Sequence, residues 1–332
     1  MGIKNLTQTI KKYSPDSIHN ENLYKCSGKR VAVDASLILY QQLLNTKHGF
    51  FKNSHGKITN HITGLFYKIM NYISLNIELI FIFDGAPPLN KKDCIQARKT
   101  KSDKFKEMSE KTNSIEEKEK LEKKACRLTK EMIDDTKKLL NLLGISYIHP
   151  NAEGEAYAAE LCRIGYVDYV LTEDMDTLVY GCPKLIRKCI DRSIKRSDII
   201  SIFDYESIIQ NLKISEDQFI DFCILCGCDY APEIPKIGNI TALKLIQKYN
   251  TIEELIDNTK TKYNYPVNYL QLFNDAKKNF LLFKNNINVD EINIHTSDKN
   301  LSELKSFLIN DIEMNETRVN NSFKKFNQVY DN

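Results

Sequence analysis

The sequence has no long apolar stretch. None of its uncharged hydrophobic runs approaches the roughly 18 residues of a membrane span. The first residues, Met1 to Leu6, lack the hydrophobic stretch of a secretory signal. No internal repeat is visible either. These absences predict a soluble intracellular protein that does not partner a membrane.

A complete set of zinc ligands is also missing. Cys223, Cys226 and Cys228 are spaced like part of a metal knuckle, but no second cysteine pair or histidine pair follows at zinc spacing. The nine cysteines are an odd number, and we interpret them as free thiols of a reducing compartment. With 332 residues and 42% hydrophobic content, the chain can bury the core of one large domain or two small ones.

Acidic residues, in contrast, occur where apolar strands end or helices begin. The apolar runs 31–33, 79–83 and 169–171 each end at or shortly before an acid, and open α/β sheets bind ligands beyond the carboxyl ends of their strands. Crowded carboxylates repel one another unless divalent cations neutralise them, and hard oxygen ligands favour Mg²⁺ or Mn²⁺. The pattern predicts a two-metal phosphodiesterase. The acids are Asp34, Asp84, Glu153, Glu155, Asp174, Asp176 and Asp229.

The rest of the chain is basic. The formal net charge is +3, and it rises to +10 when the seven proposed site acids are set aside. Residues 91–106 hold seven Lys or Arg against two Asp. Such a run is also typical of an ordinary solvated face. Beside the acids, the surplus favours a polyanionic substrate.

The hydrophobic pattern alternates strands and helices, which favours an α/β fold with a mainly parallel, twisted sheet flanked by helices. Residues 91–138 interrupt it, because they are highly charged and have few apolar positions. They predict an exposed helical insertion. The expected elements are strand 31–34, a helix from about 36, helix 62–73, strand 79–83, a helix that Gly144 ends, strand 145–148, helix 153–161, and strands 169–171 and 185–190.

Beyond about residue 201 the chain is predicted to be helical. Segments 215–218 and 251–254 match the capping box of a helix start. Between them, residues 235–238 lead into a helix over 240–249, and a hairpin between helices can offer backbone N–H groups to a phosphate. The Asn- and Lys-rich segment after about residue 284 is predicted to be the least ordered part.

Several short motifs follow the order of a known family. They are Met1-Gly2-Ile3, Val33-Asp34-Ala35-Ser36, Phe83-Asp84-Gly85, Glu153-Gly154-Glu155-Ala156, Thr172-Glu173-Asp174-Met175-Asp176 and Gly227-Cys228-Asp229-Tyr230. Through them nearly the whole chain resembles the flap endonucleases, the structure-specific 5′ nucleases of the XPG/Rad2 type. The resemblance implies a PIN-like nuclease core at 1–210 with a helical arch at about 91–138, a helix-two-turn-helix duplex-binding region at 211–275, and a partly helical, less ordered segment at 276–332.

The resemblance also assigns all seven acids to a site for two Mg²⁺ ions, with Mn²⁺ as a substitute. Some of the acids act there through bound water. Taken alone, Glu153 and Glu155 also fit helix N-terminal acids that interact with the dipole, and Asp174 and Asp176 also fit a polar loop.

Three further residues match functional positions of the family. Lys91 and Arg98 match a basic pair that stabilises transition-state charge, and seven residues are almost two helical turns, so both can face one phosphate. Otherwise they are two exposed cations of a basic helix. Tyr40 matches an aromatic that stacks on a nucleobase beside the scissile phosphate. Otherwise it is a helix tyrosine that packs on the core.

The hairpin resembles the duplex-binding helix-two-turn-helix, here with Lys236, Gly238 and Lys244, which in the family often holds K⁺. Lys236 stands where the family usually has the first hairpin glycine, and residues 239–241 stand where it has a proline and two basic residues. Both differences bear on the expected binding of K⁺ and of duplex DNA. The printed sequence ends without the sliding-clamp motif Gln-x-x-hydrophobic-x-x-aromatic-aromatic and without a basic tail.

We therefore expect a Mg²⁺-dependent 5′ flap endonuclease and 5′-3′ exonuclease, a monomer that cuts DNA with flaps, nicks or gaps in the nucleus or another site of replication. Its products would carry 5′-phosphate and 3′-hydroxyl ends. Related alternatives are a 5′-3′ exonuclease or a junction-cutting nuclease, but the arch length favours the flap enzyme. A non-catalytic DNA-binding scaffold would be expected to have lost acids, and none is lost. RNA processing stays open, since nothing in the sequence reads a 2′-hydroxyl.

Overall fold

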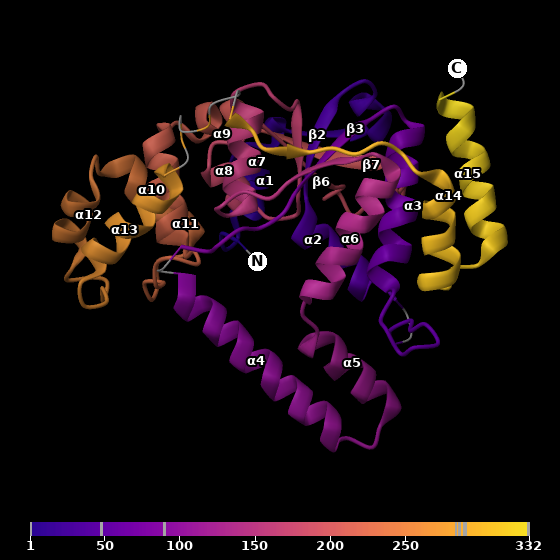
Figure 1. The fold of residues 1–332 in the computed structure, drawn as a ribbon. Coiled ribbons are helices and arrows are strands. Elements are labelled where there is room, and N and C mark those ends of the chain that lie inside the picture. The colour runs from indigo at the N-terminus through magenta and orange to yellow at the C-terminus, as the bar shows by residue number, and fades with distance from the viewer. Residues whose placement is uncertain are drawn as a thin grey trace. The chain divides into compact units, whose positions relative to one another are not determined.

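A computed structural model describes residues 2–46, 49–88, 91–282, 284, 287 and 291–330. The chain forms two compact units, each assembled from three separate segments. The first unit comprises Met1–Lys25, Gly85–Cys94 and Pro150–Ile292, and the second comprises Cys26–Asp84, Ile95–His149 and Asn293–Asn332. Each unit contributes strands and buried hydrophobic residues of its own. Figure 1 shows the helices and strands with their labels.

The first unit contains four strands in the order β1-β7-β6-β5. These are β1 (Ile18–Asn22), β5 (Tyr169–Leu171), β6 (Lys184–Lys188) and β7 (Ile199–Asp204). β5 and β6 pair in parallel, whereas β7 pairs antiparallel with both β6 and β1. The central strand β7 is largely buried, and β5 ends just before the loop that carries Asp174.

Helices make up most of the first unit. α10 begins with the predicted capping box, in which Ser215 and Gln218 exchange side-chain and backbone hydrogen bonds. At the start of α12 the Thr251 hydroxyl accepts a hydrogen bond from the N–H of Glu254, as in a capping box. The Glu254 carboxylate, however, accepts from the N–H of Asn250. The helices are α1 (Leu6–Tyr13), η1 (Pro15–Ser17), α7 (Gly154–Arg163), α8 (Asp176–Val179), α9 (Tyr205–Leu212), α10 (Glu216–Cys226), α11 (Asn239–Lys248), α12 (Ile252–Thr259) and α13 (Tyr269–Leu281), while η2 (Leu23–Cys26) ends in the second unit.

The second unit contains four strands in the order β2-β3-β4-β8. They are β2 (Arg30–Asp34), β3 (Glu78–Ile82), β4 (Ser146–Ile148) and β8 (Ile294–His295). β2, β3 and β4 are parallel, and β8 pairs antiparallel with β4. Because Asp34 pairs with Ile82, the residues that follow β2 and β3 emerge at the same edge.

The predicted apolar stripes of the second unit are buried. α2 (Ala35–Leu44), α3 (Asn60–Ser74) and α6 (Lys130–Leu143) contact the strands, with Leu65, Phe66 and Ile69 of α3 fully buried. α6 ends at Gly144, which has the positive φ of 69° that a glycine adopts without strain. α14 (Leu301–Ser306), η5 (Phe307–Asp311) and α15 (Glu316–Tyr330) complete the unit.

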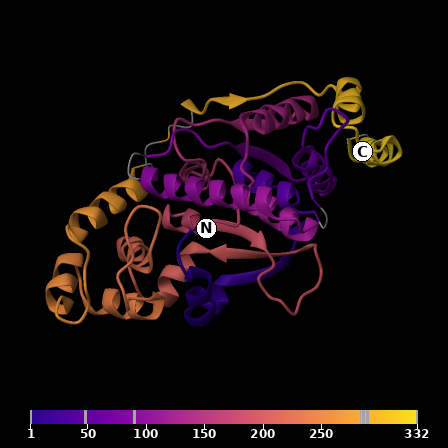
Figure 2. The ribbon, with the colours of Figure 1, turned by 90° about the horizontal axis from the view of Figure 1, so that it is seen from below.

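The charged segment after residue 91 is helical, as its composition predicts. It contains α4 (Lys92–Lys111), which runs as one long helix (Figure 2), and α5 (Ile115–Ala125). Most side chains of both helices are exposed. The Ser102 hydroxyl donates a hydrogen bond of 2.7 Å to the Ala125 carbonyl, which ties α4 to the end of α5.

The α/β fold is confirmed, and the structure adds that its sheet is mixed. The expected strands did not include β1, β7 or β8, and β7 (Ile199–Asp204) pairs antiparallel where the chain was predicted to turn helical from about residue 201. β1 reads Ile-His-Asn-Glu-Asn, a polar edge sequence that carries no strand pattern. The segment after residue 284 is more regular than its composition predicts, because α14 and α15 bury Leu304 and Val319; its residues 283, 285–286, 288–290 and 331–332 lie outside the described ranges. No helix in the described part of the chain has the length and apolar composition to cross a membrane.

Candidate metal centre

Three acids of the first unit converge at the end of β5. Glu155 lies in the first turn of α7, Asp174 lies in the loop after β5, and Asp176 begins α8. One carboxylate oxygen of each lies within 4.8 Å of the others, which is close enough for a single metal ion to bridge them.

Burial makes this cluster unfavourable without a cation. Asp174 and Asp176 are 7% and 4% exposed. Burial raises the pKa of Asp174 above its ordinary value, and burial, followed by the charges of Asp174 and Asp229, raises the pKa of Asp176 well above it. The oxygen-only ligands and their mutual repulsion fit a hard divalent cation.

The N-terminal segment packs directly on this cluster. The backbone N–H of Ile3 donates a hydrogen bond of 2.8 Å to Asp176 Oδ1. Gly2 has a φ of 88°, and a Cβ at this position would collide with Asp174 Oδ1. Gly2 and Ile3 were part of a sequence motif, but their contact with the acids could not be predicted because 173 residues separate Ile3 from Asp176.

Lys91 adds a positive charge beside the cluster. Its Nζ donates a hydrogen bond to Glu153 Oε1 and lies 3.8 Å from Asp229 Oδ2. Burial alone would lower the pKa of Lys91, but Glu153, Glu155 and Asp229 raise it overall. The ammonium therefore stays charged. The Cys94 thiol also donates to Asp229 Oδ1, at 3.4 Å.

Two tyrosines hold the other oxygen of Glu153. Tyr230 and Tyr180 both donate to Glu153 Oε2, the latter at 3.1 Å, and their hydroxyl oxygens are 2.7 Å apart. Burial is the largest cause that raises the pKa of both phenols. They therefore keep their protons and act as donors. Tyr230 belonged to a predicted motif, whereas Tyr180 carried no sequence signal.

The other two predicted metal acids belong to the second unit. Asp34 is the last residue of β2 and caps α2 by accepting a 2.9 Å hydrogen bond from the N–H of Leu37. Asp84 is exposed and follows β3 by two residues. Asp34 therefore lies at the carboxyl end of β2, and Asp84 lies just beyond the carboxyl end of the neighbouring parallel strand β3.

The remaining predicted residues lie on helices. Arg98 is exposed on α4 within the second unit, and Tyr40 is half-buried on α2. Lys236 has a left-handed φ of 69°, which matches the conformation expected of the glycine it replaces. Gly238 caps α11, a Cβ there would meet no atom within 4 Å, and Lys236 and Lys244 are exposed. A backbone could approach Gly238 closely.

Comparison with known proteins agrees with this geometry. Two family profiles match the chain, the XPG N-terminal domain over residues 1–105 and the XPG I-region over residues 144–229. Flap endonuclease 1 of Glycine max is 34% identical over 335 residues, which cover 98% of this chain and 86% of that protein. The chain belongs to the flap endonuclease family.

Solved structures support the same family fold. Flap endonuclease-1 from Methanococcus jannaschii is similar with a TM-score of 0.69 and 25% identity, over 94% of this chain and 96% of that one. The catalytic core of Rad2 in complex with a DNA substrate has a TM-score of 0.69 at 22% identity, over 98% of this chain and 99% of that one. Flap endonuclease family membership and the buried acids together fit divalent-metal binding.

Proposed function

We infer that the chain is a structure-specific 5′ flap endonuclease, a hydrolase that cuts phosphodiester bonds in DNA. The observation that carries this conclusion is the buried cluster of Glu155, Asp174 and Asp176 in a chain of the flap endonuclease family. We propose two Mg²⁺ ions as the cofactor, with Mn²⁺ as a substitute. Asp34, Asp84, Glu153 and Asp229 complete the site, some of them through water.

The chemistry divides between the metals and the protein. Mg²⁺ bound at these acids would orient and activate the attacking water and neutralise the leaving 3′ oxygen, which gives 5′-phosphate and 3′-hydroxyl products. The protein contributes acids that are shielded from water, since Asp174 and Asp176 are 7% and 4% exposed. Charges that water screens less attract a cation more strongly.

Lys91 and Arg98 are proposed to stabilise negative charge on the phosphoryl oxygens in the transition state. Lys91 is suited to this because its ammonium is mostly buried beside Glu153 and Asp229. When the substrate phosphate arrives, Lys91 can turn from Glu153 toward it. Arg98 is the second cation, seven residues along the chain.

Substrate choice is proposed to depend on α4, α5 and the hairpin before α11. The exposed, charged helices α4 and α5 serve as the arch for a free 5′ strand, and Tyr40 stacks on a base next to the scissile phosphate. Lys236, Gly238 and Lys244 contact the phosphates of duplex DNA. The left-handed turn at Lys236 keeps the hairpin geometry in which carbonyls could hold K⁺.

The proposed setting follows from these substrates. DNA with 5′ flaps, nicks or gaps arises where DNA is replicated and repaired, so we place the enzyme there, in the nucleus or an equivalent compartment. We propose that it acts as a monomer.

A panel of labelled DNAs tests this proposal. The expected result is Mg²⁺-dependent cutting of a 5′ flap, with slower trimming at nicks and gaps. A bulky adduct placed on the 5′ end before mixing should inhibit cutting, and the same adduct added after binding should not. Equal cutting of a DNA bubble without a free 5′ end would refute threading and favour a junction-cutting enzyme.

Neutralising Lys236 and Lys244 tests the duplex grip. Each lost phosphate contact should reduce the slope of log affinity against log salt by about 1, for every duplex-containing substrate alike. A loss confined to one sequence would contradict a backbone contact.

A further inference from the structure

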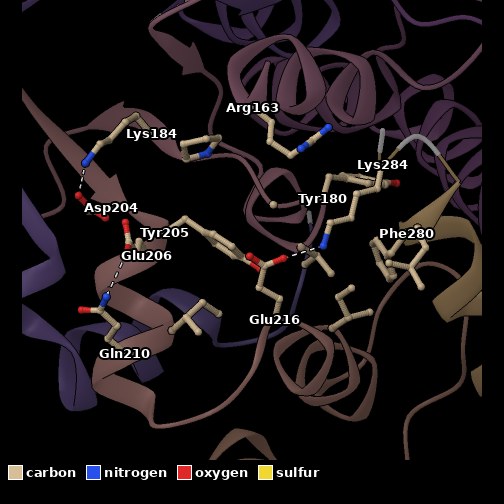
Figure 3. A pocket seen from close by; sticks show the side chains of 16 residues that line it. Arg163, Tyr180, Lys184, Asp204, Tyr205, Glu206, Gln210, Glu216, Phe280 and Lys284 are labelled. Atoms are coloured by element: carbon tan, nitrogen blue, oxygen red, sulfur yellow. Dashed lines mark hydrogen bonds and ion pairs between the residues drawn. The ribbon is translucent and has the colours of Figure 1, made fainter. Parts of the chain in front are cut away.

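Tyr180 is placed between the acidic cluster and a cavity of the first unit. It follows α8, the helix that begins with Asp176, and its backbone N–H donates to the Asp176 carbonyl at 3.2 Å. Its ring lies against Phe280, with centroids 5.2 Å apart, and lines a cavity of about 520 Å³ whose other walls include Tyr205 (Figure 3). Its hydroxyl points the other way, to Glu153.

The Tyr180 hydroxyl has one proton and two oxygens within hydrogen-bond distance. Tyr180, Tyr230 and Glu153 Oε2 make three close contacts, but the two phenols supply only two protons. Tyr230 donates its proton to Glu153 Oε2. The single proton of Tyr180 is therefore shared between Tyr230, at 2.7 Å, and Glu153, at 3.1 Å. Donation to Tyr230 strengthens the bond that Tyr230 makes, since chained hydrogen bonds polarise one another.

This arrangement leaves Glu153 little freedom. Lys91 holds Oε1, and the two tyrosines hold Oε2. Phe280 backs both rings, because Tyr230 also packs edge-on against it with centroids 5.1 Å apart. The carboxylate orientation is thus fixed from a side where Phe280 packs against both tyrosine rings.

We propose that Tyr180 is a positioning residue, which fixes the Glu153 carboxylate through its own hydroxyl and through Tyr230 and so prepares the acidic cluster for metal. The inference rests on the proposed metal role of Glu153. Hydrogen-bond partners behind metal-site carboxylates commonly change metal affinity by 10–100-fold when removed. Tyr180 needs its hydroxyl for this role, whereas its ring alone satisfies the packing.

Tyr180→Phe is the test, because it deletes only the hydroxyl and keeps the ring against Phe280. Mn²⁺ binding without DNA, followed by the free-ion electron paramagnetic resonance signal, should weaken about 10-fold. Single-turnover flap cleavage should need about 10-fold more Mg²⁺ and should recover at saturating metal. Tyr205→Phe, on the opposite wall of the same cavity, should change neither value.

The controls distinguish the positioning role of Tyr180 from the metal role of Glu153. An unchanged metal midpoint in Tyr180→Phe, together with a large shift in Glu153→Gln, would overturn the positioning role and leave the proposed function intact. No shift in Glu153→Gln would instead remove Glu153 from the metal site. If Tyr180→Phe lowers the melting temperature, a double-mutant cycle with Tyr230→Phe decides. A loss of metal affinity in the double variant that is smaller than the product of the two single-variant losses supports the shared role. A loss equal to that product overturns it.

Discussion

The acidic cluster of the first unit and the helices α4 and α5 both consist largely of charged residues, but they hold them differently. Asp176 is 4% exposed and shares its surroundings with Asp174 and Asp229. On α5, the side chains of Glu116 and Lys120 are 80% and 67% exposed and pair with each other across one helical turn. Both regions can be recognised in the sequence as rich in charge.

The difference teaches that burial, rather than charge count, identifies chemistry in this chain. Exposed ion pairs are screened by water and contribute little to stability. Buried carboxylates of like sign destabilise the protein unless a cation binds, so their persistence indicates a function. The contrast between the buried acids and the exposed helices leads to four expected outcomes.

Asp176→Asn should have the largest effect. Flap cleavage should fall by on the order of 10³-fold or more, because the metal loses a ligand. DNA binding should be retained, and without metal the melting temperature should rise, since one of the repelling buried charges is gone. Quenched-flow cleavage, DNA titration and calorimetry without metal measure the three quantities.

The matched control is Asp168→Asn, an exposed acid just before β5. It should cut at nearly the normal rate. Undiminished Mg²⁺-dependent cleavage by Asp176→Asn would break the metal assignment, and a lower melting temperature without metal would contradict the account of repulsion.

Lys91→Ala should reduce single-turnover cleavage by on the order of 10²-fold with a much smaller change in affinity, because its contact strengthens in the transition state. Lys92→Ala, its exposed neighbour, is the control and should mainly affect the salt dependence of binding. An equal loss of affinity and rate for Lys91→Ala would reassign Lys91 to electrostatic capture of DNA.

His61 of α3 sharpens the contrast, because it is a buried titratable group outside the candidate site. It is fully buried, with Nε2 3.9 Å from Asp135 Oδ2. Burial, and then the charge of Lys57, lower the pKa of His61 to about 4 against the opposing effect of Glu131. In the unfolded chain, His61 therefore binds a proton as the pH falls through about 6.5. In the folded chain it stays neutral until about pH 4.

Stability should consequently fall as the pH drops from about 6.5 toward 4. The loss between pH 7 and pH 5 should be about 2 kcal/mol from His61. Urea unfolding at both pH values measures this loss. In His61→Gln the difference in unfolding free energy between the two pH values should be smaller, even if the substitution changes the stability at both. An equally steep pH dependence in His61→Gln would show that other groups carry it.

Glu116→Gln should have the smallest effect. The lost partner of Lys120 is fully exposed, so the melting temperature should not change measurably, even at low salt. A clear drop would mean that α5 depends on its surface pairs, and the contrast between the two regions would weaken.

The sequence predicted the parts of the fold that depend on short-range pattern. The helix containing Met132, Thr136 and Leu139 and its glycine end at 144 formed as expected, because its apolar spacing and cap are local. The antiparallel strands β1, β7 and β8 were missed, since pairing such as that of β1 with β7 is set by distant partners. Ile18, for example, pairs with Phe203. The domain boundaries inferred from sequence stay predictions.

The site was predicted unevenly for the same reason. Acids that follow apolar strands have a local signal, and Glu155, Asp174 and Asp176 come together as expected. Tyr180 has no such signal, and the motif that contains Gly2 did not reveal its contact, because Tyr180 and Gly2 meet Glu153 and Asp174 only in the folded chain. Roles for Arg98, Tyr40 and Lys244 depend on DNA and stay predictions.

The hydrogen bond between Ile3 and Asp176 also affects how the protein is made. The two residues are 173 positions apart, so at roughly 5–20 residues per second a ribosome needs about 10–35 s to add the second after the first. Until then the N-terminal segment has no partner, and the acids it contacts do not yet exist. The contact between Ile3 and Asp176 therefore forms only after more than half of the 332 residues have been joined.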